Sequence, residues 1–250
     1  MHATVDVQLK QKSHDKHYRY AASPCHQRAV ELHASAVRIA MSDICIIIPF
    51  RDRQSHLDVL LRHLRDMLPD TIEYIVVEQS LGNKFNRGLL LNVGFNATTR
   101  DRVIFHDVDL VPSEPLAQQY VAPWTRPIVH FGCRFGRYNN TRSYFGGVLG
   151  FCRHAFPGFS NRYYGWGGED DSLLRRCSHS IARPAVGAYT DLEFLPTVRS
   201  KLQRLDASTK CMTKWEVRDS ECFETDNHNT VDVQFIETQT HGCRWLHVPL

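Results

Sequence analysis

The acidic pair Asp107-Val108-Asp109, which follows a run of apolar residues, is the first candidate for chemistry in the sequence. Carboxylates two positions apart at an irregular strand end can hold a hard divalent cation, one directly and the other through a hydrogen bond. Such an ion, Mg²⁺ or Mn²⁺, would bridge to a diphosphate and neutralise charge on a departing leaving group. A solvated turn with an acidic rim gives the same pattern, so the pair alone leaves both interpretations open.

Two basic motifs precede the acidic pair in the chain. The first is Pro49-Phe50-Arg51-Asp52-Arg53, in which two arginines could contact phosphate or ribose oxygens with forked geometry. The second is Phe85-Asn86-Arg87-Gly88, in which an exposed aromatic ring could stack on a nucleobase. A charged loop would equally explain the first motif, and packing of Phe85 beneath a sheet would equally explain the second.

The stretch from Gly165 to Asp171 is the most unusual in the sequence, because glycines surround Trp166 and three carboxylates follow. An open backbone leaves the indole ring available to the face of a sugar. Of the carboxylates, one could act as general base on a sugar hydroxyl while another orients that hydroxyl. Capping of a helix explains one acidic residue but does not explain the Trp-Gly-Gly sequence that precedes the carboxylates. The segment Tyr144–Val148 could line a sugar pocket, or it could be a strand with a glycine bulge.

Elements of a parallel α/β fold are expected around these motifs, because β-branched runs alternate with segments of helical periodicity. Ligands in such sheets bind beyond the carboxyl ends of the strands, where the acidic pair and the two arginines lie. Ser55 is expected to cap the first helix. We expect strands at 44–48, 74–78 and 102–105, and helices through 57–68, 87–96 and 170–176.

The composition indicates a globular protein with one domain and excludes some classes of partner. The chain has 250 residues, 42% of them hydrophobic, and a formal net charge of +3, which is too small to indicate a nucleic-acid or anionic-membrane surface. None of its apolar stretches approaches the length of a membrane span. Residues 1–42 are interpreted as a lead-in or stem-like segment with a helix over 27–41, and residues 43–250 as the catalytic domain. Eight cysteines without C-x-x-C spacing make a zinc site a weak interpretation.

Taken together, five motifs in order and spacing resemble the β-1,4-galactosyltransferase family, most strongly over residues 44–184. A weaker similarity continues through Asn229–Val233 to the C-terminus. The resemblance implies a GT-A fold, which is an α/β fold with a mostly parallel central sheet flanked by helices, and inversion at the anomeric carbon. It also implies a UDP-galactose donor, a glycan acceptor of the N-acetylglucosamine type, Mn²⁺ (or Mg²⁺) and a place in the Golgi lumen. The absence of a visible signal or anchor leaves the cytoplasm as the alternative. The motifs are Ile48–Arg53, Phe85–Gly88, Asp107–Asp109, Tyr144–Gly147 and Trp166–Asp171.

The resemblance also assigns roles to individual residues. It makes Asp170 the catalytic base and Glu169 its acceptor-binding partner, with Tyr144 and Gly168 also at the substrate. Tyr144 matches a tyrosine that disfavours N-acetylated donors, and Asp109 would bind the metal. Contacts to the sugar nucleotide would come from Pro49, Arg51, Arg53, Phe85, Arg87, Asp107, Val108 and Trp166.

One departure from the family concerns the metal. Where the family supplies methionine and histidine, or two histidines, this chain has Gly187–Phe194, with Asp191 at a ligand position and Glu193 close by. All-oxygen ligation suits Mn²⁺ or Mg²⁺. A site rebuilt with His241 or His247 is an alternative. Transfer of N-acetylgalactosamine, galactose transfer to xylose, and a catalytically silent sugar- or nucleotide-binding protein also remain open.

Overall fold

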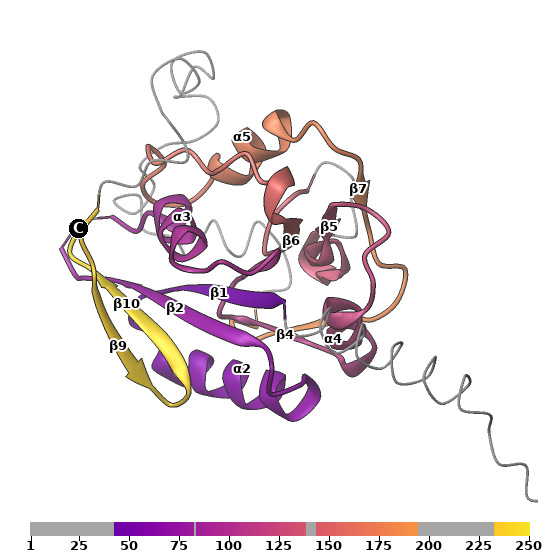
Figure 1. Ribbon diagram of the computed structural model, residues 1–250, viewed down its shortest axis with the longest axis horizontal. Helices are drawn as coiled ribbons and strands as arrows, with labels where there is room; N and C mark the ends of the chain where they lie inside the picture. The colour runs from indigo at the N-terminus through magenta and orange to yellow at the C-terminus, as the bar shows by residue number, and fades with distance from the viewer. Residues whose placement is uncertain (1–42, 83, 139–143, 195–232) are drawn as a thin grey trace, which may run out of the picture. The chain divides into compact units, whose positions relative to one another are not determined.

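A computed structural model describes residues 43–82, 84–138, 144–194 and 233–250, which form an α/β fold around an eight-stranded mixed sheet (Figure 1). The sheet order is β7-β5-β6-β3-β1-β2-β10-β9, and β4 and β8 form a separate two-stranded sheet. The strands are β1 (Ile44–Phe50), β2 (Glu73–Gln79), β3 (Arg102–His106), β4 (Leu110–Pro112), β5 (Ile128–His130), β6 (Val148–Cys152), β7 (Ile181–Ala182), β8 (Tyr189–Asp191), β9 (Ile236–Thr240) and β10 (Cys243–Val248).

The centre of the large sheet is parallel, as the sequence predicts. Strand β1 runs parallel to both β2 and β3, and β10 runs parallel to β2. Antiparallel neighbours, β6 beside β3 and β9 beside β10, lie outside this centre. Every residue of β1 is buried, which explains why its sequence is almost continuously β-branched rather than alternating. Because β1, β2 and β3 are parallel, their carboxyl ends meet at one edge of the sheet.

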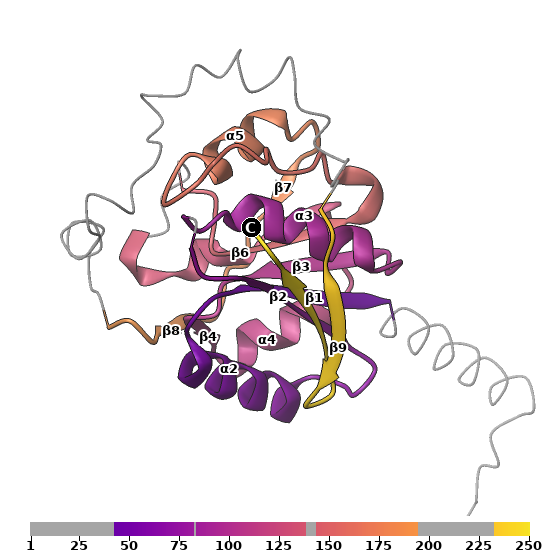
Figure 2. The same cartoon turned by 90° about the vertical axis from the view of Figure 1, so that its left-hand side faces the viewer.

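Helices cover both faces of this sheet (Figure 2). On one face lie α2 (Gln54–Met67) and α4 (Glu114–Val121), and on the other lie α3 (Arg87–Ala97) and α5 (Glu169–Arg176). Short 3-10 turns are η1 (Phe131–Arg134), η2 (Gly136–Tyr138) and η3 (Arg153–Ala155). Side chains of β1 alternate between the two cores, with Ile46 facing α2 and Ile47 facing α3. Helix α3 approaches closely because Gly94 faces Ile47, where an added Cβ would lie 2.4 Å from Ile47 Cγ2.

The predicted elements are present, with three differences. Ser55 does not cap α2, because the helix begins at Gln54 and Arg53 occupies the cap position without a side-chain cap bond. The pairing of β4 with β8 was not expected, since both strands are only three residues long. The C-terminal hairpin of β9 and β10 was not expected either.

Parts of the chain predicted from sequence lie outside the described residues. These include the lead-in segment 1–42 with its expected helix, and residues 229–232 of the C-terminal similarity. In the described ranges, five cysteines are present and none forms a disulfide. Those ranges also contain no helix whose length and apolar character would suit a membrane crossing.

Candidate active site

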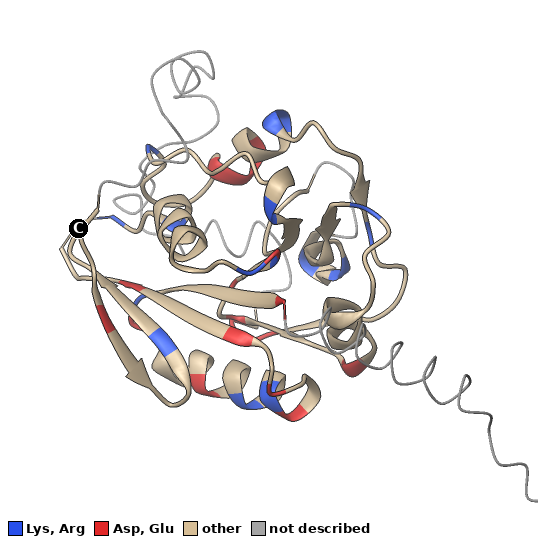
Figure 3. Cartoon of the chain, viewed as in Figure 1, with Lys and Arg blue, Asp and Glu red and all other residues tan. Residues whose placement is uncertain are grey.

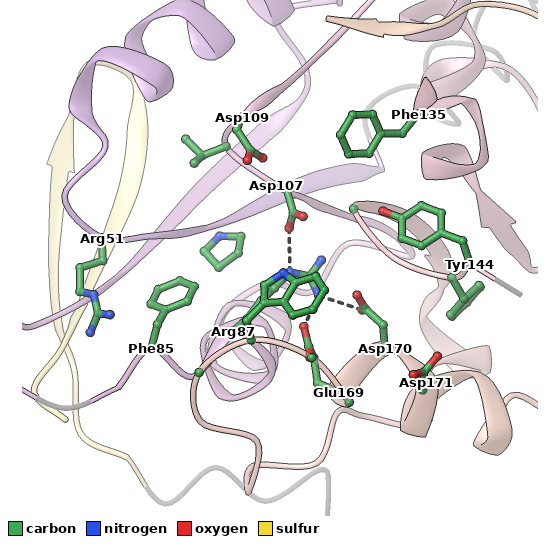
Figure 4. A pocket seen from close by; sticks show the side chains of 18 of the residues that line it. Arg51, Phe85, Arg87, Asp107, Asp109, Phe135, Tyr144, Glu169, Asp170 and Asp171 are labelled. Atoms are coloured by element: carbon green, nitrogen blue, oxygen red, sulfur yellow. Dashed lines mark hydrogen bonds and ion pairs between the residues drawn. The ribbon is translucent and has the colours of Figure 1, made fainter. Parts of the chain in front are cut away.

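A cavity of about 780 Å³ opens at the shared carboxyl edge of the parallel strands. Its walls come from the end of β1, the segment entering α3, the β3–β4 turn, η2, the segment before β6 and the start of α5 (Figure 4). Thirteen of the fourteen residues predicted from sequence line it: Pro49, Arg51, Arg53, Phe85, Arg87, Asp107, Val108, Asp109, Tyr144, Trp166, Gly168, Glu169 and Asp170. The fourteenth, Asp191, lies beside it in the acidic cluster described below.

Arg87 links three of the motifs inside this cavity. Its Nε donates to Asp107 Oδ1 at 2.7 Å, and its Nη1 donates to Asp170 Oδ1 at 2.9 Å and lies 3.7 Å from Glu169 Oε1 (Figure 4). The arginine side chain is only 11% exposed. Burial opposes its charge, but the carboxylates Asp107, Asp170 and Glu169 outweigh that cost and hold the pKa of Arg87 well above its ordinary value.

Asp170 and Glu169 stand in the first turn of α5, which begins with acidic residues and ends with basic ones (Figure 3). Negative charge is favourable there because the helix dipole is positive at its N-terminus. Burial nevertheless raises the pKa of Asp170 well above its usual range and also raises the pKa of Glu169, while Arg87 opposes both shifts. A carboxylate with a raised pKa is a stronger base, which suits proton abstraction from a hydroxyl.

Three glycines determine the backbone conformation of the segment that precedes α5. Gly165, Gly167 and Gly168 have φ values of 92°, 102° and 97°, a region that other residues rarely adopt. An added Cβ at Gly168 would also lie 2.5 Å from the Tyr163 ring. The backbone conformation before α5 therefore requires the glycines that follow Trp166, and these glycines also leave space around its ring.

The wall beside the start of α5 is formed by aromatic rings and glycine backbone. Tyr144 stacks on Tyr138 with ring centroids 3.6 Å apart and an interplanar angle of 6°. Gly146 lies against Asp170, since a Cβ added there would be 2.3 Å from Asp170 Oδ2. The segment before β6 is thus neither a regular strand nor a loose loop, because β6 begins only at Val148 and Gly147 has a φ of 71°.

At the other end of the cavity, Arg51 lies over the Phe85 ring, with its guanidinium carbon 5.1 Å from the ring centroid. Phe85 is partly buried against the core and also lines the cavity, where its stacking on a nucleobase stays a prediction. A flat ring and a guanidinium side by side offer stacking and phosphate contacts to the same ligand.

A second acidic cluster is made by Asp109, Asp191 and Glu193, whose carboxylate oxygens can all lie within 4.8 Å of one another. Pairing of β4 with β8 brings these residues together, and Leu192 N donates to Asp109 O at 2.9 Å. The sequence prediction of Asp191 beside Asp109 matches this geometry. Neither His241 nor His247 belongs to the cluster; His247 instead pairs with Glu78 at 3.0 Å, and the carbonyl of His241 accepts from Arg65.

Two arginines balance this acidic cluster. Arg53 Nη2 lies 2.8 Å from Glu193 Oε1, and its Nη1 lies 3.4 Å from Asp109 Oδ2. Arg137 Nη2 pairs with Asp191 and lies 3.4 Å from Glu193 Oε2. The sequence interpretation missed Arg137 and its neighbour Tyr138. The available signal was an aromatic, glycine and arginine grouping over residues 135–138, similar in type to residues 85–88.

Known proteins similar to this chain identify its family. A family model described as the N-terminal region of glycosyl transferase group 7 matches residues 3–121, and one described as the N-terminal domain of galactosyltransferase matches residues 126–195. Human β-1,4-galactosyltransferase 4 is 39% identical over 166 residues, covering 60% of this chain and 48% of that protein. The chain belongs to the β-1,4-galactosyltransferase family. Human β-1,4-galactosyltransferase 5 is 40% identical over 167 residues, covering 60% of this chain and 42% of that protein.

Solved structures extend the similarity of this family member to the fold. The catalytic domain of Drosophila β1,4-galactosyltransferase 7 in complex with xylobiose superimposes with a TM-score of 0.66 at 25% identity, covering 83% of this chain and 93% of that one. A mutant of the same enzyme in complex with manganese, UDP-Gal and xylobiose gives a TM-score of 0.64 at 23% identity, with the same coverage. The fold is therefore GT-A, as predicted. The chain spans about half the length of the curated relatives it matches.

Proposed function

We propose that this chain is an inverting galactosyltransferase that moves galactose from UDP-galactose to a hydroxyl of a glycan acceptor. The observation that carries the proposal is the buried arrangement in which Arg87 joins Asp107 to Asp170 within one cavity. This arrangement supports the proposal because Asp170, the proposed base, and Asp107, beside the proposed leaving-group site, share one cation. A buried carboxylate in a cavity, with its pKa raised by burial, is suited to proton transfer, which favours an enzyme over a protein that only binds sugar or nucleotide.

In the proposed reaction the acceptor hydroxyl oxygen attacks the anomeric carbon of galactose while the bond from that carbon to the UDP oxygen breaks. The hydroxyl proton passes to the carboxylate of Asp170. Because one in-line displacement occurs, the configuration at the anomeric carbon inverts. Glu169, which shares Arg87 with Asp170, would accept a hydrogen bond from the acceptor and so orient it.

The residues present suit a divalent cation. Asp109, Asp191 and Glu193 offer only carboxylate oxygens, which Mn²⁺ and Mg²⁺ prefer. Among the described residues, five basic and five acidic side chains line the cavity, and Asp191 and Glu193 beside it add two negative charges that a divalent cation would balance. When bound, the ion would neutralise charge on the diphosphate leaving group. We propose these three residues as its ligands, with Asp107 in support.

The nucleotide would occupy the end of the cavity near Pro49, Arg51 and Phe85. There the Phe85 ring could stack on uracil while Arg51 and Arg53 contact ribose or phosphate oxygens. Arg87 Nη2 is buried without a hydrogen-bond partner among the described residues, so it keeps one donor for the bound sugar nucleotide. Val108 and Trp166 would complete the contacts to the donor, and Tyr144 would disfavour an N-acetylated one.

Two acceptor classes remain, and the proposal favours one. An acceptor of the N-acetylglucosamine type follows from the family resemblance, with Gly168, Glu169 and Asp170 at its hydroxyl. Galactose transfer to xylose is the second candidate, because the Drosophila structure that superimposes on this chain holds xylobiose. A Golgi location is proposed on family membership.

The test of this function is release of UDP from UDP-galactose with Mn²⁺ and a panel of acceptors that includes N-acetylglucosamine, glucose and xylose. Asp170→Asn should abolish turnover while UDP still binds with nearly unchanged affinity, because the substitution removes the base but keeps the shape. Unchanged turnover by Asp170→Asn would refute its role as base. If no donor is consumed with any acceptor in the presence of Mn²⁺ or Mg²⁺, the sugar- or nucleotide-binding interpretation takes its place.

A further inference from the structure

Behind the proposed metal site lies a buried chain of three polar side chains, called here the relay: His106, Tyr120 and Tyr189. His106 Nε2 lies 3.1 Å from the Tyr120 hydroxyl, which lies 2.8 Å from the Tyr189 hydroxyl. His106 Nδ1 lies 2.8 Å from the backbone oxygen of Asp107. His106 and Tyr120 are fully buried, and the two tyrosine rings each pack edge to face against the imidazole.

The donor and acceptor of each hydrogen bond in the relay can be assigned by starting from the carbonyl oxygen of Asp107. A carbonyl oxygen only accepts, so Nδ1 of His106 carries a proton and donates it. Burial lowers the pKa of His106 to about 4, so the ring is neutral near pH 7 and Nε2 must accept from Tyr120. With its single proton engaged in this way, Tyr120 can only accept from Tyr189. The relay therefore runs from Tyr189 through Tyr120 and His106 to Asp107.

At one end the relay holds the turn that presents Asp109. The oxygen of Asp107 that accepts from His106 also accepts from Leu110 N at 3.4 Å, which closes the turn between β3 and β4. In addition, Asp107 N donates to Gly147 O at 3.0 Å. The backbone of Asp107 is thus held at both its N–H and its carbonyl oxygen, and the direction of the Asp109 side chain depends on that turn.

At its other end the relay holds β8. Tyr189 pairs with Pro112 and Asp191 with Leu110 across the two-stranded sheet, and residues two apart in a strand point to the same side. Only three residue pairs join β4 to β8, so this small sheet has few hydrogen bonds of its own. The relay adds a cross-link from β8 to β3 through the core beside it.

We propose that Tyr120 is a positioning residue for the metal site, because the relay sets the distance between Asp109 on its turn and Asp191 on β8. This inference rests on the proposed function, since it takes Asp109, Asp191 and Glu193 as the ligands. Tyr120 touches none of these carboxylates and acts through His106 on one side and Tyr189 on the other. Its hydroxyl therefore contributes to metal affinity without contacting the ion.

The test compares Tyr120→Phe with Tyr74→Phe. Tyr74 is a buried tyrosine of β2 in the same core, and its hydroxyl has no hydrogen-bond partner among the described residues, so it controls for loss of a buried hydroxyl. The probe is Mn²⁺ alone, titrated against the full chain and followed through the spectrum of the free ion by electron paramagnetic resonance. We expect Tyr120→Phe to raise the Kd for Mn²⁺ about tenfold, as changes around metal ligands do, and Tyr74→Phe to leave it within twofold.

A second measurement separates positioning from general stability. The rise in Tm on adding Mn²⁺ should shrink for Tyr120→Phe and stay unchanged for Tyr74→Phe, whatever the Tm without metal. Tyr189→Phe breaks the same cross-link, so the double variant with Tyr120→Phe should bind Mn²⁺ about as weakly as Tyr120→Phe alone.

The possible failures are distinguishable. If Tyr120→Phe binds Mn²⁺ like the natural chain while Asp109→Ala does not bind it, the metal site stands and the relay has no part in it. Equal loss of affinity in Tyr120→Phe and Tyr74→Phe also overturns the positioning role. If the natural chain binds no Mn²⁺, the proposed metal site falls and the inference falls with it.

Discussion

Gly146→Ala is a sharp test of the proposed base, because the substitution adds one methyl group and removes no functional atom. An added Cβ at Gly146 would lie 2.3 Å from Asp170 Oδ2 and 3.0 Å from Asp170 Cγ. The backbone there does not require glycine, since Gly146 is not among the residues with positive φ. The strain of the substitution therefore falls on the carboxylate rather than on the chain.

The expected magnitude follows from this overlap. Ordinary contact begins at 3.4 Å, so the Asp170 carboxylate must move by about 1 Å to accommodate the methyl group. Its hydrogen bond to Arg87, now 2.9 Å, limits how it can move without losing that partner. A displacement of about 1 Å in a reacting group costs about 100-fold in rate, equivalent to about 2.7 kcal/mol of barrier. We expect kcat/KM to fall by about that factor.

The assay is UDP release at saturating Mn²⁺, with the Kd of UDP measured by calorimetry on the same samples. Gly136→Ala is the matched control, because Gly136 lies in η2 between the cavity-lining residues Phe135 and Arg137, has no positive φ, and a Cβ added there meets nothing within 4 Å. The control should keep kcat/KM within twofold. If Gly146→Ala also keeps kcat/KM within twofold while Asp170→Asn is inactive, the contact does not determine the position of the base. If Gly146→Ala loses UDP binding, the methyl group has closed the cavity instead.

Two further predictions concern charge in the site. Asp191→Asn should raise the Kd for Mn²⁺ at least tenfold, because it removes a charged oxygen ligand. Asp171→Asn, a change in the cavity but outside the acidic cluster, should leave that Kd unchanged. Each variant is titrated with Mn²⁺, and equal affinities would remove Asp191 from the ligand set. Asp170 must be ionised to act as base, and burial raises its pKa well above its usual range. On acidification, kcat/KM at saturating Mn²⁺ should therefore fall at a pH clearly above the ordinary aspartate pKa of about 3.9. A profile that stays flat down to pH 4 would contradict either the raised pKa or the role of Asp170 as base.

The elements around the site were predictable from sequence because their signals are local. The buried run Ile44–Ile48 and the leucine periodicity of α2 each follow from burial on one or two faces. The boundary at Ser55 was wrong because a serine near a helix start is a common cap, while here the chain leaves β1 through Asp52, whose φ is 52°, and turns directly into the helix at Gln54.

What escaped prediction depends on contacts between distant segments. The β4–β8 pair is too short for any periodicity, yet it brings Asp191 and Glu193 beside Asp109. Arg137 and Tyr138 lie in η2, where local sequence specifies little regular structure. The relay combines residues of β3, α4 and β8, and neither its histidine nor its tyrosines stand in a recognisable motif.

Arg87 shows why the separate motifs occur together in one chain. Its partners Asp107 and Asp170 lie 20 and 83 residues away in the sequence, and both are held by one guanidinium. A lysine at this position has a single ammonium group and could not hold two carboxylates with the same fork geometry. Without that cation, Asp107, Glu169 and Asp170 would be buried near one another with like charge, which is costly even before a ligand arrives. The arginine is therefore required by the acidic motifs themselves, and its Nη2, buried without a hydrogen-bond partner among the described residues, is the atom proposed to contact the sugar nucleotide.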